Sequence, residues 1–107
     1  MVIHHESLID KDSFDLIKSG AKRLKFYLND SKRQGLKTGD FIKYINKETS
    51  DIMIVSAKQI TKAENSDILV EKLNLDQEQV TYINRCFSVK DQEKYGLLAV
   101  QIEKEAL

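Results

Sequence analysis

The side chains with the clearest potential for chemistry lie in one stretch, residues 18–37. This stretch holds seven Lys or Arg residues against a single acidic residue, Asp30, which gives it a local charge of +6. Lysine and arginine contact phosphates, and an aromatic ring such as that of Tyr27 offers a face on which a nucleobase can stack. We expect a binding surface for RNA, a nucleoside or a nucleotide that is formed by six side chains: Lys22, Arg23, Lys25, Tyr27, Lys32 and Arg33.

The whole chain has no net charge, because 17 Lys and Arg residues balance 17 Asp and Glu residues. This balance hides a gradient: residues 1–50 carry +3 (10 minus 7), and residues 51–107 carry −3 (7 minus 10). A basic patch on a neutral protein still attracts an anion to one face. The alternative is a solvated, charge-rich loop, and charge alone does not choose between the two.

Other residue types with catalytic or metal-binding potential are few. His4 and His5 are adjacent, so on a strand they would face opposite sides, and we expect no metal site. Cys86 and a histidine would make a nucleophile and its base, but nothing near Cys86 supports this pairing, and we expect a small buried apolar residue. The four glycines are dispersed and form no phosphate-binding loop, so we expect no cofactor.

Length and composition indicate one folded domain. The chain has 107 residues, of which 41% are hydrophobic, and a single cysteine excludes an internal disulfide. No apolar run approaches the ~18 residues of a membrane-spanning helix, and the first residues do not have the pattern of a signal peptide. We therefore expect a soluble cytoplasmic protein with no membrane partner, formed by residues 1–107 as one domain.

The strand that carries the basic residues shows period-2 alternation over residues 22–28. Apolar side chains point one way at positions 24, 26 and 28, so Arg23, Lys25 and Tyr27 are predicted to form an outward face. Lys22 shares the parity of the apolar row and lies at the entry of the strand, beside Gly20. This pattern predicts a strand with one face on the core and a basic, aromatic face outside.

The remaining elements follow from periodicity and from turn and cap residues. We expect further strands over 2–8, 41–46, 51–61 and 97–103, with tight turns at 37–40 and 47–50. Helices are expected from a cap at Asp10 or Asp12 to Gly20, over 66–73 and 76–85 with caps at Ser66 and Asp76, and from Ser88 to residue 94 before Gly96. In outline, the sequence predicts an α+β fold: a small, mainly antiparallel β-barrel of about five strands with two or three short helices packed on it.

Six residues in chain order are similar to the signature of the ASCH domain family, a relative of the PUA RNA-binding fold: Gly20, Lys22, Gly39, Asp40, Tyr95 and Gly96. The resemblance covers roughly residues 4–103. It implies a PUA-like barrel with a cleft that meets nucleic acid or a modified nucleoside. The sequence departs from the signature at two positions, where Lys25 replaces a glutamate and Tyr27 replaces an arginine.

The resemblance allows two functions. The first is an RNA- or nucleotide-binding module that uses a basic cleft. The alternative is a small amidohydrolase acting on an acylated nucleoside such as N4-acetylcytidine, because similar bacterial members use a lysine, a threonine and a glutamate. Lys22 would be the catalytic lysine, Lys25 occupies the threonine position, and Glu71 or Glu78 lies in the region of the glutamate. A protein-interaction role for the acidic stretch 64–78 is a third possibility.

Overall fold

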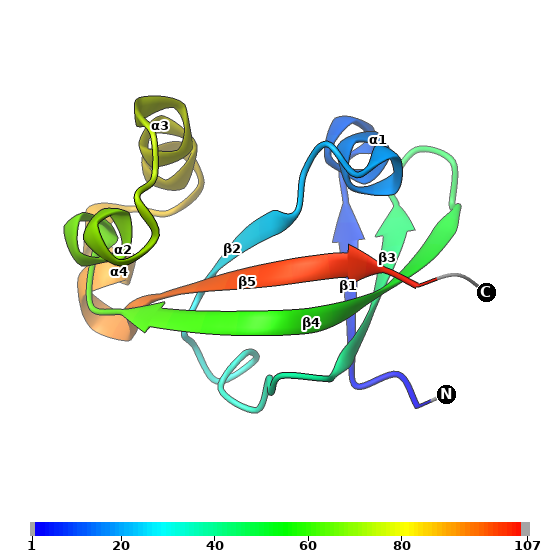
Figure 1. Ribbon diagram of the computed structural model, residues 1–107, viewed down its shortest axis with the longest axis horizontal. Helices are drawn as coiled ribbons and strands as arrows, with labels where there is room; N and C mark the ends of the chain where they lie inside the picture. Colours follow the sequence, from blue (N-terminus) through cyan, green and yellow to red (C-terminus); the bar gives the residue numbers. More distant parts are fainter. Residues whose placement is uncertain (1, 106–107) are drawn as a thin grey trace. The chain divides into compact units, whose positions relative to one another are not determined.

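The computed structural model describes residues 2–105, which form five strands and four helices (Figure 1). In chain order the elements are β1 (His5–Ile9), α1 (Lys11–Ser19), β2 (Leu24–Leu28), β3 (Phe41–Asn46), β4 (Ile52–Ala63), α2 (Ser66–Leu73), α3 (Gln77–Cys86), α4 (Val89–Tyr95) and β5 (Leu97–Lys104). The predicted α+β class with about five strands is confirmed. The structure has four helices, one more than the two or three in the summary prediction, and each corresponds to one of the four ranges in which a helix was expected.

The five strands form one mixed sheet in the order β1-β3-β4-β5-β2. β1 pairs in parallel with β3, from His5 opposite Ile42 to Ile9 opposite Asn46. β3 and β4 are antiparallel and joined by the turn at 47–50, as the sequence predicted. β4 and β5 are neighbours in the sheet, and Figure 1 shows them running in opposite directions. The parallel β1–β3 pair makes the sheet less uniformly antiparallel than expected, because α1 and β2 intervene between these two strands in the chain.

Helix α1 begins and ends where its cap residues place it. The side chain of Asp10 accepts a hydrogen bond from the backbone N–H of Ser13 (3.0 Å), so Asp10 rather than Asp12 is the N-cap. Gly20 ends the helix in the left-handed conformation (φ 85°), which glycine adopts without steric cost. The buried side chains of Phe14 and Ile17 form one face of the helix, which packs against β3.

Strand β2 does not keep the strict alternation that the sequence predicted. Phe26 is buried as expected, but the neighbouring Tyr27 is also buried, with 8% of its surface exposed. The prediction that Tyr27 faces outward is therefore wrong, because the guanidinium of Arg33, itself buried, lies over the Tyr27 ring. The strand also begins at Leu24, so Lys22 and Arg23 belong to the connection that precedes it.

The three helices between β4 and β5 are fixed by polar caps. α2 starts from Asn65, whose side chain accepts a hydrogen bond from the N–H of Ile68 (3.0 Å), so the predicted cap at Ser66 is wrong by one residue. Asp76 caps α3 through a capping box with Gln79, and Ser88 caps α4; both were predicted. Asn65 and Ser66 are both residue types that cap helices, and in the structure Asn65 is the N-cap and Ser66 is the first residue of α2.

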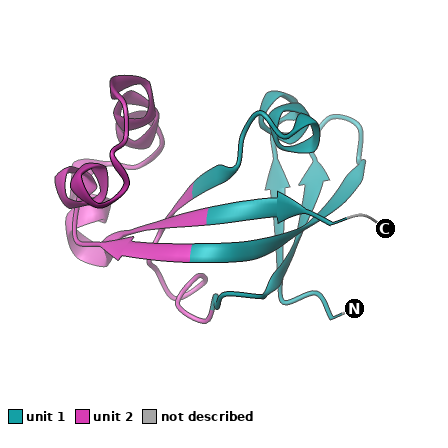
Figure 2. Ribbon diagram, in the orientation of Figure 1, with its two compact units in different colours: residues 1–25, 36–59, 101–107 teal, residues 26–35, 60–100 magenta. Residues whose placement is uncertain are grey.

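Two compact units divide the chain (Figure 2). Unit 1 comprises residues 1–25, 36–59 and 101–107, and its core includes Ile42, Tyr44 and Val55. Unit 2 comprises residues 26–35 and 60–100, and its core includes Leu69 and Ile83. Strands β2, β4 and β5 each continue from one unit into the other, and one domain over residues 1–107 stays a prediction.

Within residues 2–105, none of the helices has both the length and the apolar character that crossing a membrane requires.

Candidate nucleic-acid interface

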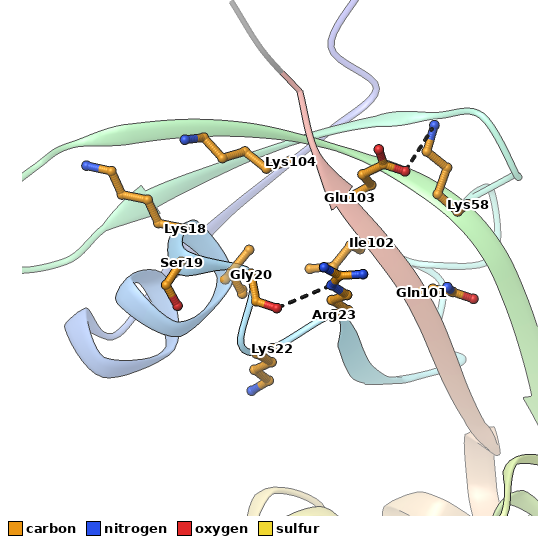
Figure 3. A pocket seen from close by; sticks show the side chains of 11 residues that line it. Lys18, Ser19, Gly20, Lys22, Arg23, Lys58, Gln101, Ile102, Glu103 and Lys104 are labelled. Carbon is orange, nitrogen blue, oxygen red and sulfur yellow. Dashed lines mark hydrogen bonds and ion pairs between the residues drawn. The ribbon is translucent and has the colours of Figure 1, made fainter.

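A pocket of about 330 Å³ lies in unit 1, where the end of α1 meets strands β4 and β5 (Figure 3). We call it the basic pocket. The residues that line it are Ile17, Lys18, Ser19, Gly20, Lys22, Arg23, Lys58, Gln101, Ile102, Glu103 and Lys104. Two of these, Lys22 and Arg23, are predicted binding residues. The pocket therefore brings part of the basic stretch together with residues from the far end of the chain.

The lining of the basic pocket is strongly cationic. Five of its side chains are Lys or Arg and one is acidic, which gives a local charge of +4. The acidic residue, Glu103, lies 3.8 Å from the ammonium group of Lys58, so part of its charge is compensated within the pocket. In Figure 3, Lys22 points away from this pair, while Lys18 and Lys104 extend together toward one side. A concave surface lined by one sign of charge focuses the field and attracts counter-ions.

The connection from Gly20 to Arg23 is held at both ends by backbone hydrogen bonds. At its start, the N–H of Lys22 donates to the carbonyl of Leu16 in α1 (3.0 Å). At its end, the N–H of Ile102 in β5 donates to the carbonyl of Arg23 (2.8 Å). The Nε of Arg23 also donates to the carbonyl of Gly20 (3.2 Å), which orients the exposed guanidinium beside the pocket. The connection is thus a fixed element that presents Lys22 and Arg23.

Lys25 and Lys32 lie outside the lining of the basic pocket. Lys25 is half-buried on β2 in unit 1. Lys32 is exposed in unit 2, in the turn after β2, where its backbone N–H donates to the carboxylate of Asp30 (3.1 Å). The contact of Lys25 and Lys32 with a ligand stays a prediction.

Tyr27 and Arg33 form a buried pair in unit 2. The guanidinium carbon of Arg33 lies 4.4 Å from the centre of the Tyr27 ring, and Arg33 is only 9% exposed. This geometry is that of a cation–π contact. The structure therefore does not present the Tyr27 ring as an open stacking face, because the guanidinium covers it. Arg33, which the sequence grouped with the ligand-binding cations, is part of the packing of unit 2.

Sequence reasoning missed three cations of the basic pocket: Lys18, Lys58 and Lys104. Lys18 belongs to the basic stretch and lies in the last turn of α1, next to the Gly20 cap. Its position could therefore have been predicted from the local sequence. Lys58 and Lys104 come from β4 and β5 and lie tens of residues further along the chain. Only the pairing of the strands brings them to this pocket, and no local pattern encodes that pairing.

The two histidines meet at one carboxylate, which the sequence did not predict. Nε2 of His5 lies 3.2 Å from Oδ2 of Asp40, and Nδ1 of His4 lies 3.8 Å from Oδ1. The opposite-face argument fails because His4 precedes β1 and does not follow its alternation. His4 instead accepts a hydrogen bond from the N–H of Phe41 (3.1 Å). No group of three metal-ligating side chains occurs among residues 2–105.

Asp40 joins β1 to the turn at 37–40 and is largely buried. Burial raises the pKa of the Asp40 carboxyl, but hydrogen bonds from the backbone N–H of Lys37 (2.9 Å) and from His5 outweigh it and hold that pKa below its ordinary value. The charged carboxylate thus stabilises the turn that contains Gly39, the predicted tight turn before β3.

The remaining candidates for catalysis are not among the residues that line the basic pocket. Cys86 is exposed at the end of α3, so the prediction of a buried apolar cysteine is wrong; the helix end simply places it at the surface. Glu71 on α2 and Glu78 on α3 are both exposed and belong to unit 2. None of these three residues lines the basic pocket.

No family model matches the sequence, and no curated protein matches it. Solved structures do match. The hypothetical protein PH0355 is 26% identical, with a TM-score of 0.76 over 94% of this chain and 98% of its own. Protein PF0455 from Pyrococcus furiosus is 23% identical, with a TM-score of 0.69 over 99% of this chain and 100% of its own.

A third similar structure is the ASCH domain from Lactobacillus crispatus, with 14% identity and a TM-score of 0.59 over 94% of this chain and 78% of that one. The chain has an ASCH-like fold. At this identity the likeness concerns the fold alone, and it confirms the resemblance drawn from the sequence at that level. The glycines of the ASCH-like motif have clear structural roles, since Gly20, Gly39 and Gly96 all have positive φ angles at the ends of elements.

Proposed function

We propose that this chain is an RNA- or nucleotide-binding module whose anion-binding site is the basic pocket. The observation that carries the proposal is the lining of the pocket, which holds five cationic side chains and a single carboxylate, that of Glu103, which is paired with Lys58. A pocket of this charge favours a polyanion or a phosphorylated ligand over a neutral one. The resemblance to ASCH domains points in the same direction, because that family is related to the PUA RNA-binding fold.

Lys22 and Arg23 are the central contacts in this proposal. Arg23 is exposed, and its guanidinium presents paired N–H donors that match the oxygens of a phosphate. Lys22 is half-buried and adds a compact positive charge from the same fixed connection. Lys25 and Lys32 remain proposed flanking contacts. Tyr27 and Arg33 support the fold of unit 2 in this account and do not touch the ligand.

The proposal is tested by titrating labelled single-stranded and hairpin RNAs at ~50 and ~200 mM salt, the range over which phosphate contacts weaken strongly. A Lys22→Glu/Arg23→Glu variant reverses two charges of the pocket. Lys47→Glu/Lys90→Glu is the matched control, because both lysines are exposed, lie outside the described pockets and change the net charge by the same amount.

We expect salt-sensitive binding by the unmodified protein and a loss of roughly 30-fold or more in the pocket variant, since two phosphate contacts become repulsive. The control variant should lose far less. An equal loss of RNA affinity in both variants would show that binding depends on the net charge of the protein and not on the basic pocket. No RNA binding at either salt concentration would contradict the proposal directly.

The geometry favours binding over the amidohydrolase alternative. Hydrolysis of an acylated nucleoside would need a free carboxylate or hydroxyl beside Lys22. Among the residues that line the pocket, Glu103 pairs with Lys58, and the hydroxyl of Ser19 donates to the carbonyl of Leu16 (3.1 Å). Incubation with N4-acetylcytidine and chromatography should therefore show no turnover. Turnover that disappears in Lys22→Ala would reverse this ranking.

A further inference from the structure

A second pocket, of about 530 Å³, adjoins the basic pocket within unit 1. We call it the neutral pocket. The residues that line it are Phe14, Lys18, Asp51, Ile52, Met53, Ile54, Lys104 and Glu105. Lys18 and Lys104 line both pockets, so the two hollows meet at these side chains. Neither the sequence nor the proposed anion site assigns any role to the neutral pocket.

The two pockets differ in chemistry. The basic pocket carries a charge of +4, whereas in the neutral pocket Lys18 and Lys104 are balanced by Asp51 and Glu105. The four uncharged residues of the neutral pocket are apolar; Phe14, Met53 and Ile54 are buried, and Ile52, at the start of β4, is 58% exposed. An exposed isoleucine in a hollow is a favourable contact for the face of a flat, weakly polar group. One hollow thus suits an anion, and the adjoining one suits an uncharged ring.

Most of the residues that line the neutral pocket come from regular elements and from a hydrogen-bonded chain end. The backbone N–H of Glu105 donates to the carbonyl of Ile54 (2.9 Å), which ties the end of the chain beyond β5 to β4. Lys18 is fixed at the other side by the last turn of α1. Ile52 itself is the first residue of strand β4 and is not part of a loop.

We propose that the two pockets together bind single-stranded RNA, with a phosphate in the basic pocket and an adjacent base against Ile52 in the neutral pocket. This inference rests on the proposed function and deepens it. Lys18 and Lys104, at the boundary, would contact the phosphate that links the two nucleotides. The base must be unpaired, because only a base splayed out of a helix can turn its face toward a protein hollow. The smallest ligand that fills both pockets is longer than one nucleotide.

The first test uses the unmodified protein and synthetic oligonucleotides of equal length. A series of single-stranded RNAs, each with one abasic position, is compared with the intact strand by fluorescence anisotropy. Removing the bound base takes away its apolar contact with Ile52, so binding should weaken roughly five-fold or more. One position in the series should show this loss. Equal affinity at every position would overturn the proposal.

The second test changes the neutral pocket. Ile52→Thr keeps a β-branched residue on the strand and removes apolar surface, and Leu8→Thr is its control because Leu8 is 62% exposed on β1 and lines neither pocket. We expect Ile52→Thr to weaken binding of the intact strand about three-fold to ten-fold and to leave binding of the abasic strand unchanged. The salt dependence should stay the same, because no phosphate contact is lost.

The outcomes separate the two proposals. If the unmodified protein binds no RNA, the proposed function fails. If it binds RNA with normal salt dependence but Ile52→Thr and Leu8→Thr bind alike, the anion site stands and the base-binding role of the neutral pocket is wrong. A mononucleotide that binds as tightly as a trinucleotide would also overturn the two-pocket ligand.

Discussion

The basic stretch of residues 18–37 divides into two regions that use the same side-chain types in different ways. In unit 1, Lys22 and Arg23 lie beside a pocket with three further cations. In unit 2, Arg33 is buried over the ring of Tyr27. A run of positive charge in a sequence therefore does not define a site. Burial and the nearest partner decide whether a cation is available to a ligand or is part of the fold.

The difference has a physical cause. A guanidinium is weakly hydrated and planar, so it can leave water and stack on an aromatic face at little cost. Arg33 has such a face in Tyr27, whereas the guanidinium of Arg23 donates to the carbonyl of Gly20 and remains exposed. The two arginines are ten residues apart in one basic stretch. Arg33 is packed on Tyr27 inside unit 2, and Arg23 is exposed beside the basic pocket.

The largest expected effect is on the structure of unit 2, from Gly96→Ala. Gly96 has φ 76° and ψ −178°, and a Cβ there would lie 2.9 Å from the backbone carbonyl oxygen of Ala63. Strain and this contact together should lower the free energy of unfolding by about 3 kcal/mol or more. Gly39→Ala is the control, because Gly39 also has positive φ (94°) but an added Cβ would meet nothing within 4 Å. Gly39→Ala should lower the free energy of unfolding by only about 1–2 kcal/mol. Urea denaturation measures both, and equal losses would contradict the assigned contact.

The comparison of the two arginines is tested by Arg33→Ala and Arg23→Ala. Removing Arg33 uncovers Tyr27 and leaves a gap, so the free energy of unfolding should fall by about 2 kcal/mol while RNA affinity of the folded protein is kept. Arg23→Ala should do the opposite, with stability within about 0.5 kcal/mol of the original and weaker RNA binding. Denaturation and anisotropy on the same samples give both values. A loss of affinity in Arg33→Ala without a loss of stability would reverse the roles assigned here.

Asp40→Asn tests the turn that supports β3 in unit 1. Asparagine cannot replace the charged acceptor for Lys37 and His5, so at pH 7 the variant should be less stable by about 1.5 kcal/mol. Because the folded-state pKa of Asp40 is held below 3.8, its contribution is complete above that pH and is lost as the pH falls through the folded-state value. The difference between the two proteins should therefore shrink in acid. A difference that stays constant from about pH 7 to pH 2 would exclude the charge as its cause.

The smallest expected effect is that of Lys32→Ala, which probes the edge of the proposed interface in unit 2. Lys32 is exposed, and its one identified hydrogen bond uses the backbone rather than the ammonium group. We expect unchanged stability and a loss of RNA affinity of about two- to three-fold, as for one peripheral phosphate contact. A loss as large as that of Arg23→Ala would extend the interface into unit 2.

Much of the fold could be predicted from the sequence because its signals are local. The caps at Asp10, Asp76 and Ser88 and the turn at Gly39 place elements directly, and the bounds of β3 agree with the predicted strand. Alternation in β2 failed at Tyr27, since burial on both faces of a strand depends on what packs there from elsewhere in the chain.

The site could be predicted only in part. The charge pattern found Lys22 and Arg23, which belong to one short connection after a glycine-capped helix. Lys58 and Lys104 reach the same pocket through strand pairing over a long stretch of chain, which no local pattern encodes. The meeting of His4 and His5 at Asp40 was missed for the same reason, because a parallel strand pair brings them together.

The most direct test of the central claim is the salt dependence of RNA binding by Lys22→Ala/Arg23→Ala. For single strands each phosphate contact adds ~0.7 to the slope of log affinity against log salt concentration, so losing two contacts should reduce the slope by about 1.4. Anisotropy titrations between ~50 and ~200 mM salt measure it, beside Lys47→Ala/Lys90→Ala, whose slope should be unchanged. An unchanged slope in the pocket variant, or an equal reduction in both variants, would contradict the assignment of the basic pocket as the RNA-binding site.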